Sequence, residues 1–366
     1  MRAFEVARRD LGQVRWVDGP DPTPDDGEIL LAIERLAISA NTVTYGLFGE
    51  AMHYWQYFPA SEPDWGRLPA WGFARVVRSR CPGIEAGERL YGFLPMATHL
   101  VVRPARVLAR QFMDAVPHRR ELPAAYQLYR RISHDPGHRP ELEDAQALFA
   151  PLYITSFLLD DLLVDEACFG ARSILISSAS SKTALGLAQR LALQREGTTD
   201  PVEVIGLTSP RNKAFCEALG YYDRIVDYAS LESLPSATPT VLVDFAGQWT
   251  LIARVHRHFG QALRHSCLVG FTHQQAQRPE TPLPGVEPRF FFAPERIRKR
   301  SQDWGTGGID RRFDEAWAGF APTLARWLDV ERCPPAQWPA RWRALLAGQV
   351  GPRIGLILET GENASA

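Results

Sequence analysis

Two different spacings of apolar residues divide the chain. Up to about residue 108, short segments such as GEILLAIERLAIS (27–39) carry alternating apolar positions and are bounded by Gly or Pro, which is typical of strands. From residue 151 onward, apolar segments such as RSILISSA (172–179) alternate with helical segments such as SKTALGLAQRLALQRE (181–196). This alternation predicts an α/β fold with a doubly wound parallel sheet, beside a compact β-rich domain.

Between these regions, residues 110–150 are polar, charged and helix-prone. They predict a helical insertion that lies on the surface or connects the domains. One alternative is a lid, with Tyr126, Tyr129 and His134 facing a substrate, and another is an arm that docks a partner. The tail contains two helical segments, 312–328 and 337–348, and a last strand, RIGLILE (353–359). A chain of 366 residues most naturally forms two domains.

Composition narrows the ligand class. With 41 Lys+Arg against 42 Asp+Glu, no overall field would attract nucleic acid or an anionic membrane. We find no continuous stretch of the roughly 20 apolar residues that would span a bilayer, and no signal peptide at the N-terminus. The five cysteines are scattered, which argues against a disulfide framework or a zinc clip. A small-molecule ligand and a reducing cytoplasm are therefore expected.

The segment ILISSASSKTALGLAQRLA (174–192) has the outline of the strand, turn and helix that hold a dinucleotide. Its turn has hydroxyls and a lysine where glycines are usual, at Ser180, Ser181, Lys182 and Thr183. These side chains could donate to phosphate oxygens. Equally, they are helix-capping residues on a helix that binds nothing. The ATP-binding P-loop pattern is not met, because Ile176 stands where it needs Gly.

The next strand ends in GLTSPRNKAF (206–215). NAD-preferring folds usually place an acidic residue there to bind the ribose 2′-hydroxyl. Here Ser209, Arg211 and Lys213 offer a hydroxyl and two cations instead, which suits a 2′-phosphate and predicts NADP(H). The alternative is a positively charged helix start without a ligand.

In the order of its elements, the chain resembles the medium-chain dehydrogenase/reductase superfamily, in its zinc-free quinone reductase and enoyl reductase branch. The resemblance covers nearly everything except 110–150. It is carried by GEILLAIERLAISANTVTYGLFGE, LPAWGFARVVRSRCPGIEAGERLYGFLP, SILISSASSKTALGLAQRLA, VIGLTSPRNKAFCEALGYYDRIVDY and VLVDFAG. The serine-rich turn and FFFAPERIRKR (290–300) are similar to a divergent subgroup catalogued as a domain of unknown function, DUF2855.

The resemblance implies a GroES-like catalytic domain over 1–150, a Rossmann-like domain over 151–300, and a return to the catalytic domain over 301–366. It implies no zinc, because Trp71 and Gly72 replace a His-Glu pair, and it makes a homodimer plausible. Asp244 is either a structural carboxylate or part of the site. The residues expected to bind NADP(H) are Asn41, Ser180, Ser181, Lys182, Thr183, Ser209, Arg211, Lys213, Tyr228, Phe245, Gly247, Gly270 and Phe271.

Without metal, the protein would supply orientation, an apolar cleft and a proton donor. Tyr45 and Tyr54 are the candidate catalytic proton donors, and Tyr57 and His53 are further candidates. The aromatic stretch MHYWQYFP (52–59) suits a flat or lipophilic substrate such as a quinone, an enone or a fatty acyl chain. The alternative is core packing. The leading hypothesis is an NADP(H)-dependent, zinc-independent oxidoreductase, and the other is a non-catalytic or regulatory protein that kept the fold.

Overall fold

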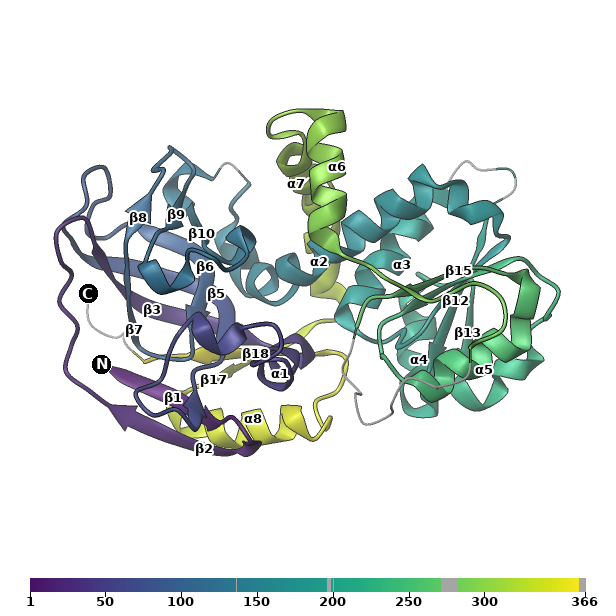
Figure 1. Cartoon of the computed structure of the whole chain (residues 1–366), viewed down its shortest axis with the longest axis horizontal. Coiled ribbons are helices and arrows are strands. Elements are labelled where there is room, and N and C mark those ends of the chain that lie inside the picture. The colour runs from purple at the N-terminus through teal and green to yellow at the C-terminus, as the bar shows by residue number, and fades with distance from the viewer. Residues whose placement is uncertain (136, 196–198, 200, 271–281, 362–366) are drawn as a thin grey trace. The chain divides into compact units, whose positions relative to one another are not determined.

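A computed structural model describes residues 1–135, 137–195, 199, 201–270 and 282–361. The chain divides into two compact units (Figure 1). The first unit combines Met1–Leu148 with Leu324–Ala366, and the second is Phe149–Thr323. A return of the C-terminal tail to the N-terminal unit was expected, but from residue 301 rather than residue 324.

The first unit is built on two mostly antiparallel sheets. The smaller sheet has the order β2-β1-β4. The larger has the order β17-β18-β3-β5-β6-β10-β9-β8, with β7 paired to β3. The strands are β1 (Arg2–Ala7), β2 (Asp10–Asp18), β3 (Ile29–Ile38), β4 (Trp65–Gly66), β5 (Pro69–Ser79), β6 (Arg89–Pro95), β7 (His99–Val102), β8 (Pro104–Ala105), β9 (Gln111–Asp114), β10 (Leu128–Arg131), β17 (Asp329–Cys333) and β18 (Ile354–Glu359). Helices α1 (Ala40–Leu47) and α8 (Trp338–Leu346) complete this unit.

The prediction of a helical insertion over 110–150 is wrong for most of that segment. Strands β9 and β10 extend the large sheet, separated by single 3-10 turns, and helix α2 (Glu143–Asp165) begins only at its end. The reason is tertiary: Phe112 and Tyr129 are each 1% exposed and stack at 5.5 Å between ring centroids. Tyr129 also donates to the carbonyl of Phe93 at 2.9 Å. Tyr129 is therefore a core residue, and His134 is exposed, so neither forms a lid.

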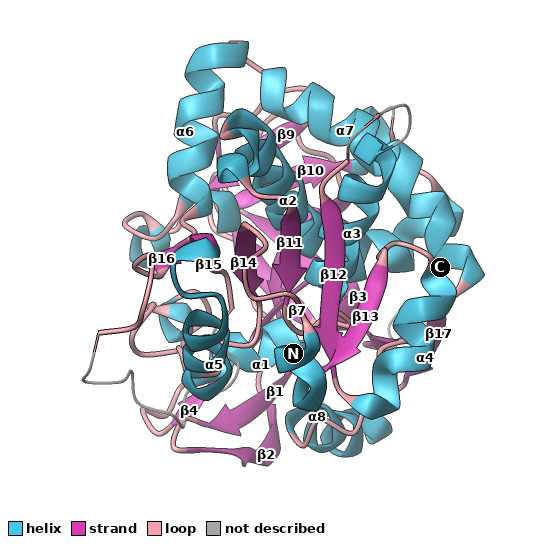
Figure 2. Ribbon diagram, turned by 90° about the vertical axis from the view of Figure 1, so that its right-hand side faces the viewer, coloured by secondary structure: helices cyan, strands magenta, loops and turns pink. Residues whose placement is uncertain are grey.

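The second unit contains a six-stranded sheet in the order β13-β12-β11-β14-β15-β16, with every pair parallel (Figure 2). Numbered within this unit, the order is 3-2-1-4-5-6, the arrangement of the dinucleotide-binding fold. Its strands are β11 (Ser173–Ile176), β12 (Glu203–Thr208), β13 (Arg224–Asp227), β14 (Thr240–Asp244), β15 (Leu263–Leu268) and β16 (Arg289–Phe290). Its crossover helices are α3 (Lys182–Arg195), α4 (Pro210–Leu219) and α5 (Trp249–Phe259). The predicted fold class is confirmed.

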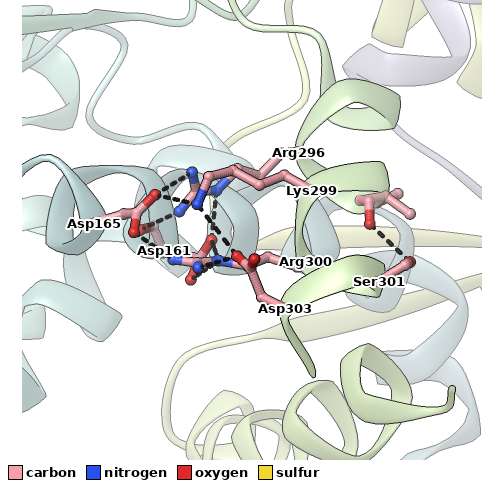
Figure 3. A network of polar contacts seen from close by, with 8 residues as sticks. Asp161, Asp165, Arg296, Lys299, Arg300, Ser301 and Asp303 are labelled. Carbon is pink, nitrogen blue, oxygen red and sulfur yellow. Dashed lines mark hydrogen bonds and ion pairs between the residues drawn. The ribbon is translucent and has the colours of Figure 1, made fainter. Parts of the chain in front are cut away.

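Helices α6 (Ala293–Trp304) and α7 (Gly308–Phe320) belong to the second unit. Ion pairs attach α6 to α2 (Figure 3). Arg296 is 7% exposed and contacts Asp161 and Asp165, and Arg300 contacts the same two carboxylates. These contacts join residues more than 130 positions apart, so the sequence pattern did not reveal them.

One helix among the described residues, Pro140–Asp165, is long and apolar enough to cross a membrane by length and composition. The sequence pattern alone did not single it out. Within the structure, 56% of its most apolar window is buried. Its Tyr153 stacks on Phe320 of α7 at 4.3 Å, and Ser156 bonds to the carbonyl of Thr183 in α3. These are the contacts of a core helix.

Candidate functional site

The order of strands in the second unit's sheet reverses between β11 and β14. From β11 the chain adds β12 and β13 on one side, and it then adds β14, β15 and β16 on the other side. In such folds, ligands bind beside the carboxyl ends of the strands at this point. Here the two ends are tied together: the Ser177 hydroxyl donates to Asp244 Oδ1 at 2.5 Å and accepts from the amide of Phe245 at 2.9 Å. Asp244 Oδ2 accepts from the amide of Gly247 at 2.7 Å. Both Ser177 and Asp244 are fully buried, so Asp244 has a structural role.

The serine-rich turn is braced by two tyrosines. Ser178 has a φ of +48°, a left-handed conformation that a glycine would adopt at lower cost. The Tyr228 hydroxyl accepts the amide of Ser178 at 3.1 Å, and Tyr222 donates to the carbonyl of Ala179 at 2.8 Å. Gly206 permits the turn to lie close to β12, because a Cβ at Gly206 would be only 2.8 Å from the Cβ of Ala179. Sequence reasoning singled out Tyr228 and missed Tyr222.

Three hydroxyl residues of the turn behave differently. Ser181 caps α3, since its carbonyl accepts from Leu185 at 2.9 Å and its hydroxyl from Ala184 at 3.4 Å. The Ser180 hydroxyl accepts from Asn212 of α4 at 2.9 Å. Within the described part of the chain, the amides of Ser180 and Thr183 meet no protein acceptor. Ser181 therefore caps α3, while donors remain at the helix start.

Lys182 is the first residue of α3 and is half-buried. Its ammonium lies 5.7 Å from the centroid of the Phe149 ring. Burial lowers the pKa of Lys182 to about 8. A cation at a helix N-terminus is also disfavoured by the helix dipole. A bound anion would relieve both effects, which makes Lys182 the residue of the turn best suited to a phosphate.

The other positively charged side chains of the predicted site follow β12, in the first turn of α4. Ser209 caps α4 by position, but its side chain makes no capping bond. Arg211, in the first turn of α4, is exposed. Lys213 Nζ lies 3.9 Å from Glu217, a weak surface pair. Helix α4 ends as predicted at Gly220, which has a φ of +69°.

The remaining predicted cofactor residues of this unit follow β14 and β15. Phe245 is 7% exposed, and Gly247 has a φ of +69°. A Cβ on Gly270 would lie 2.1 Å from the carbonyl oxygen of Phe245, so this position requires glycine. The predicted Phe271 lies outside the described residues.

In the first unit, three predicted residues come together around α1. Ser39 caps this helix in a reciprocal arrangement with Thr42. Asn41 then donates to the Tyr45 hydroxyl at 2.7 Å, and the Trp71 indole approaches the same oxygen at 3.4 Å. The rings of Tyr45 and Tyr54 are 4.6 Å apart. His53 is exposed and bonds to Gln56 instead.

Tyr126, from the 3-10 turn Ala124–Tyr126, joins the same group of rings. Its hydroxyl lies 3.3 Å from that of Tyr54, and its ring is 4.7 Å from Phe93. Tyr45 and Tyr54 are 3% and 7% exposed. Burial raises the pKa of Tyr45 and Tyr54 well above the ordinary value, and it also raises the pKa of Tyr126. They remain protonated at neutral pH and can act as hydrogen-bond donors. We refer to Tyr45, Tyr54, Tyr57, Trp71, Phe93 and Tyr126 as the aromatic cluster.

Solved structures of the same fold cover almost the entire chain. CurA from Vibrio vulnificus in complex with NADPH is 13% identical, with a TM-score of 0.59 and 99% of both chains covered. A mycobacterial protein complexed with NADPH is 17% identical, with a TM-score of 0.54, and covers 98% of this chain and 100% of that one. CurK enoyl reductase is 12% identical, with a TM-score of 0.52, and covers 94% and 95%.

No curated protein matches the sequence of this chain. A family model does match, over residues 36–351, and so covers both units. The membership suggested by the serine-rich turn is thereby confirmed: the chain belongs to the family described as a protein of unknown function, DUF2855.

Proposed function

We propose that the protein is an NADP(H)-dependent, zinc-independent oxidoreductase that transfers hydride to an activated C=C or C=O of a small lipophilic or aromatic substrate. The observation that carries this proposal is Lys182. A half-buried lysine with a lowered pKa begins the helix that follows the first strand of a 3-2-1-4-5-6 sheet. In such sheets this helix start binds the pyrophosphate.

The residues present fit the cofactor. The amides of Ser180 and Thr183 and the ammonium of Lys182 would bind the pyrophosphate. Ser209, Arg211 and Lys213 would bind the 2′-phosphate, because the Ser209 hydroxyl makes no capping bond and Arg211 is exposed. The bound cofactor supplies the hydride and its two electrons. Asn41, Tyr228, Phe245, Gly247, Gly270 and Phe271 complete the proposed set.

Tyr45 and Tyr54 are the proposed donors to the substrate. Asn41 and Trp71 both donate to the Tyr45 oxygen, which leaves the Tyr45 proton to point elsewhere. Because burial raises their pKa values, these hydroxyls would polarise a carbonyl as neutral donors rather than act as bases. Trp71 occupies the position where a zinc-dependent relative would need a ligand, and its ring packs 5.2 Å from Phe93.

The alternative is a non-catalytic protein that kept the fold. It is favoured by the turn's internal contacts, since the Ser181 hydroxyl, the Ser178 amide and the Ser180 hydroxyl are all engaged within the protein. A protein of this kind would bind neither nucleotide. Binding of NADPH without turnover of quinones, enones and enoyl thioesters would contradict the catalytic part of the proposal, whereas NADPH binding that depends on Lys182 would count against this alternative.

Titration with NADPH and NADH, followed by quenching of tryptophan fluorescence, tests the cofactor. We expect NADPH to bind more tightly. Lys182→Ala should weaken both nucleotides roughly tenfold, because both carry a pyrophosphate. Arg211→Ala should weaken NADPH roughly tenfold and leave NADH unchanged. Lys299→Ala and Arg257→Ala, exposed residues outside the proposed site, are matched controls. Equal loss in a control and its test variant would contradict the assignment.

The pH dependence of binding should report Lys182 directly. Its pKa of about 8 means that it is charged below pH 8, and a bound phosphate favours the charged form. NADPH affinity should therefore fall as pH rises through 8, by up to about tenfold per pH unit. The stability of the nucleotide-free protein has the opposite pH dependence. The buried charge of Lys182 lowers the free energy of unfolding below pH 8, and this loss is relieved as pH rises toward the ordinary lysine pKa of 10.5.

Lys182→Arg separates this effect from general pH sensitivity, because arginine keeps its charge throughout this range. Dissociation constants measured from about pH 7 to about pH 9.5 should be flat in this variant. The same decline in both proteins would show that another group titrates.

A further inference from the structure

Tyr57 has a buried hydroxyl without a partner. The residue ends the 3-10 turn Tyr54–Gln56 and is 1% exposed. Among the described residues, its hydroxyl oxygen has no hydrogen-bond partner. Buried polar groups are nearly always paired, and an unpaired one destabilises the fold. A hydroxyl retained in this state suggests that a group outside the chain completes it.

The surroundings of Tyr57 define the shape of that group. Its ring lies 5.4 Å from Phe93, 5.6 Å from Tyr126 and 6.2 Å from Tyr54. Tyr126 and Trp71 are the half-buried members of the aromatic cluster, with ring centroids 6.1 Å apart. Tyr126 is carried by a short turn whose Ala124 and Ala125 are exposed. A flat ring would therefore find aromatic surfaces to stack on where the cluster reaches the surface.

The charges around Tyr57 define the polarity of the group. Arg119 is the guanidinium that faces this region, over the ring of Phe58, but it is buried and paired with Asp114. His118 contacts the Tyr57 carbonyl, and burial lowers the pKa of its imidazole, so it is neutral at pH 7. Burial raises the pKa of Tyr57, so the hydroxyl keeps its proton. The environment favours an uncharged acceptor over an anion.

We propose that the aromatic cluster binds a flat, uncharged carbonyl compound, whose oxygen accepts the hydrogen bond that the Tyr57 hydroxyl lacks and whose ring stacks on Tyr126 and Trp71. Tyr57 is thus a specificity-determining residue. The inference rests on the proposed function and narrows its substrate class to quinones and aryl ketones, in preference to thioesters that carry anionic groups.

The test is calorimetric titration of the full chain, without nucleotide, with three probes of one ring size: 2-acetylnaphthalene, 2-ethylnaphthalene and 2-naphthoate. The wild type should bind the ketone roughly tenfold more tightly than the hydrocarbon, because only the ketone supplies an acceptor. Tyr57→Phe should abolish this preference and change hydrocarbon affinity less than about twofold. 2-Naphthoate should bind more weakly than the ketone.

The matched control is Tyr129→Phe, the same change at a buried tyrosine outside the cluster. Tyr129 donates to the carbonyl of Phe93, so this variant should unfold at lower urea concentration and keep the ketone preference. Tyr57→Phe loses no protein hydrogen bond, so its urea midpoint should be unchanged or higher. Loss of preference in a fully folded protein would identify the hydroxyl as the donor.

Three results would overturn the inference: an equal preference in Tyr57→Phe and wild type, tightest binding of 2-naphthoate, or binding of none of the probes. NADPH titration of the same samples separates this inference from the proposed function. Ketone preference without NADPH binding would defeat the oxidoreductase and leave the carbonyl site. NADPH binding without ketone preference would defeat only the carbonyl site.

Discussion

Asp244→Asn should lower the free energy of unfolding by about 2–3 kcal/mol, because a buried carboxylate that accepts two short hydrogen bonds is replaced by an amide that can accept only one of them. The side-chain NH2 of the new asparagine, which cannot accept a hydrogen bond, would face either the Ser177 hydroxyl or the backbone amide of Gly247, and both of these donate to Asp244. The turns after β11 and β14 would separate, and NADPH affinity should fall with stability.

Urea denaturation measures the stability change, and NADPH titration the functional change. Asp227→Asn is the matched control. Its carboxylate caps the 3-10 turn Tyr228–Ser233 through two amides, but it is only partly buried. We expect a loss below about 1 kcal/mol there. Equal losses of stability in the two variants would show that the hydrogen bonds of Asp244 stabilise the fold no more than those of an ordinary cap.

Arg296→Met should also lower the free energy of unfolding by about 2–3 kcal/mol, because it removes the charge-assisted hydrogen bonds of a buried guanidinium to Asp161 and Asp165 while keeping the apolar stem. Arg296 is 7% exposed, and its guanidinium donates through Nε to the Asp161 carboxylate, through Nη2 to the Asp161 backbone carbonyl and through Nη1 to the Asp165 carboxylate. Asp161 and Asp165 retain Arg300, so the loss should stay below that of an isolated buried pair.

Lys299→Met tests whether burial is the cause. Lys299 pairs with Asp165 and Asp303 in the same cluster (Figure 3), but its side chain is 49% exposed. Its removal should cost less than about 1 kcal/mol. Hydrogen exchange of α6 in both variants would locate the effect. Faster exchange in Lys299→Met than in Arg296→Met would contradict the assignment.

Much of the candidate nucleotide site could be predicted from local sequence. Lys182 begins a helix, Arg211 lies in the first turn of the next, and Gly220 ends it, as the pattern predicted. The roles of the hydroxyls could not be predicted in the same way. Whether Ser181 caps its own helix or Ser180 meets Asn212, 32 positions away, depends on how α3 and α4 sit beside each other.

The sequence by itself determined strands β11 to β15 and the crossover helices α3 to α5 of the second unit, because a strand's or helix's apolar spacing is a local property that residues a few positions apart establish. The tertiary structure decided what distant residues do together. Segment 110–142 forms strands because Phe112 and Tyr129 are buried in the large sheet, despite its polar composition. Ser177 meets Asp244, and Tyr57 meets Tyr126, only after folding brings residues 67 and 69 positions apart into contact. Hydrogen bonds and ring contacts at that separation leave no periodic trace in the chain, so the site's chemistry became visible only in three dimensions.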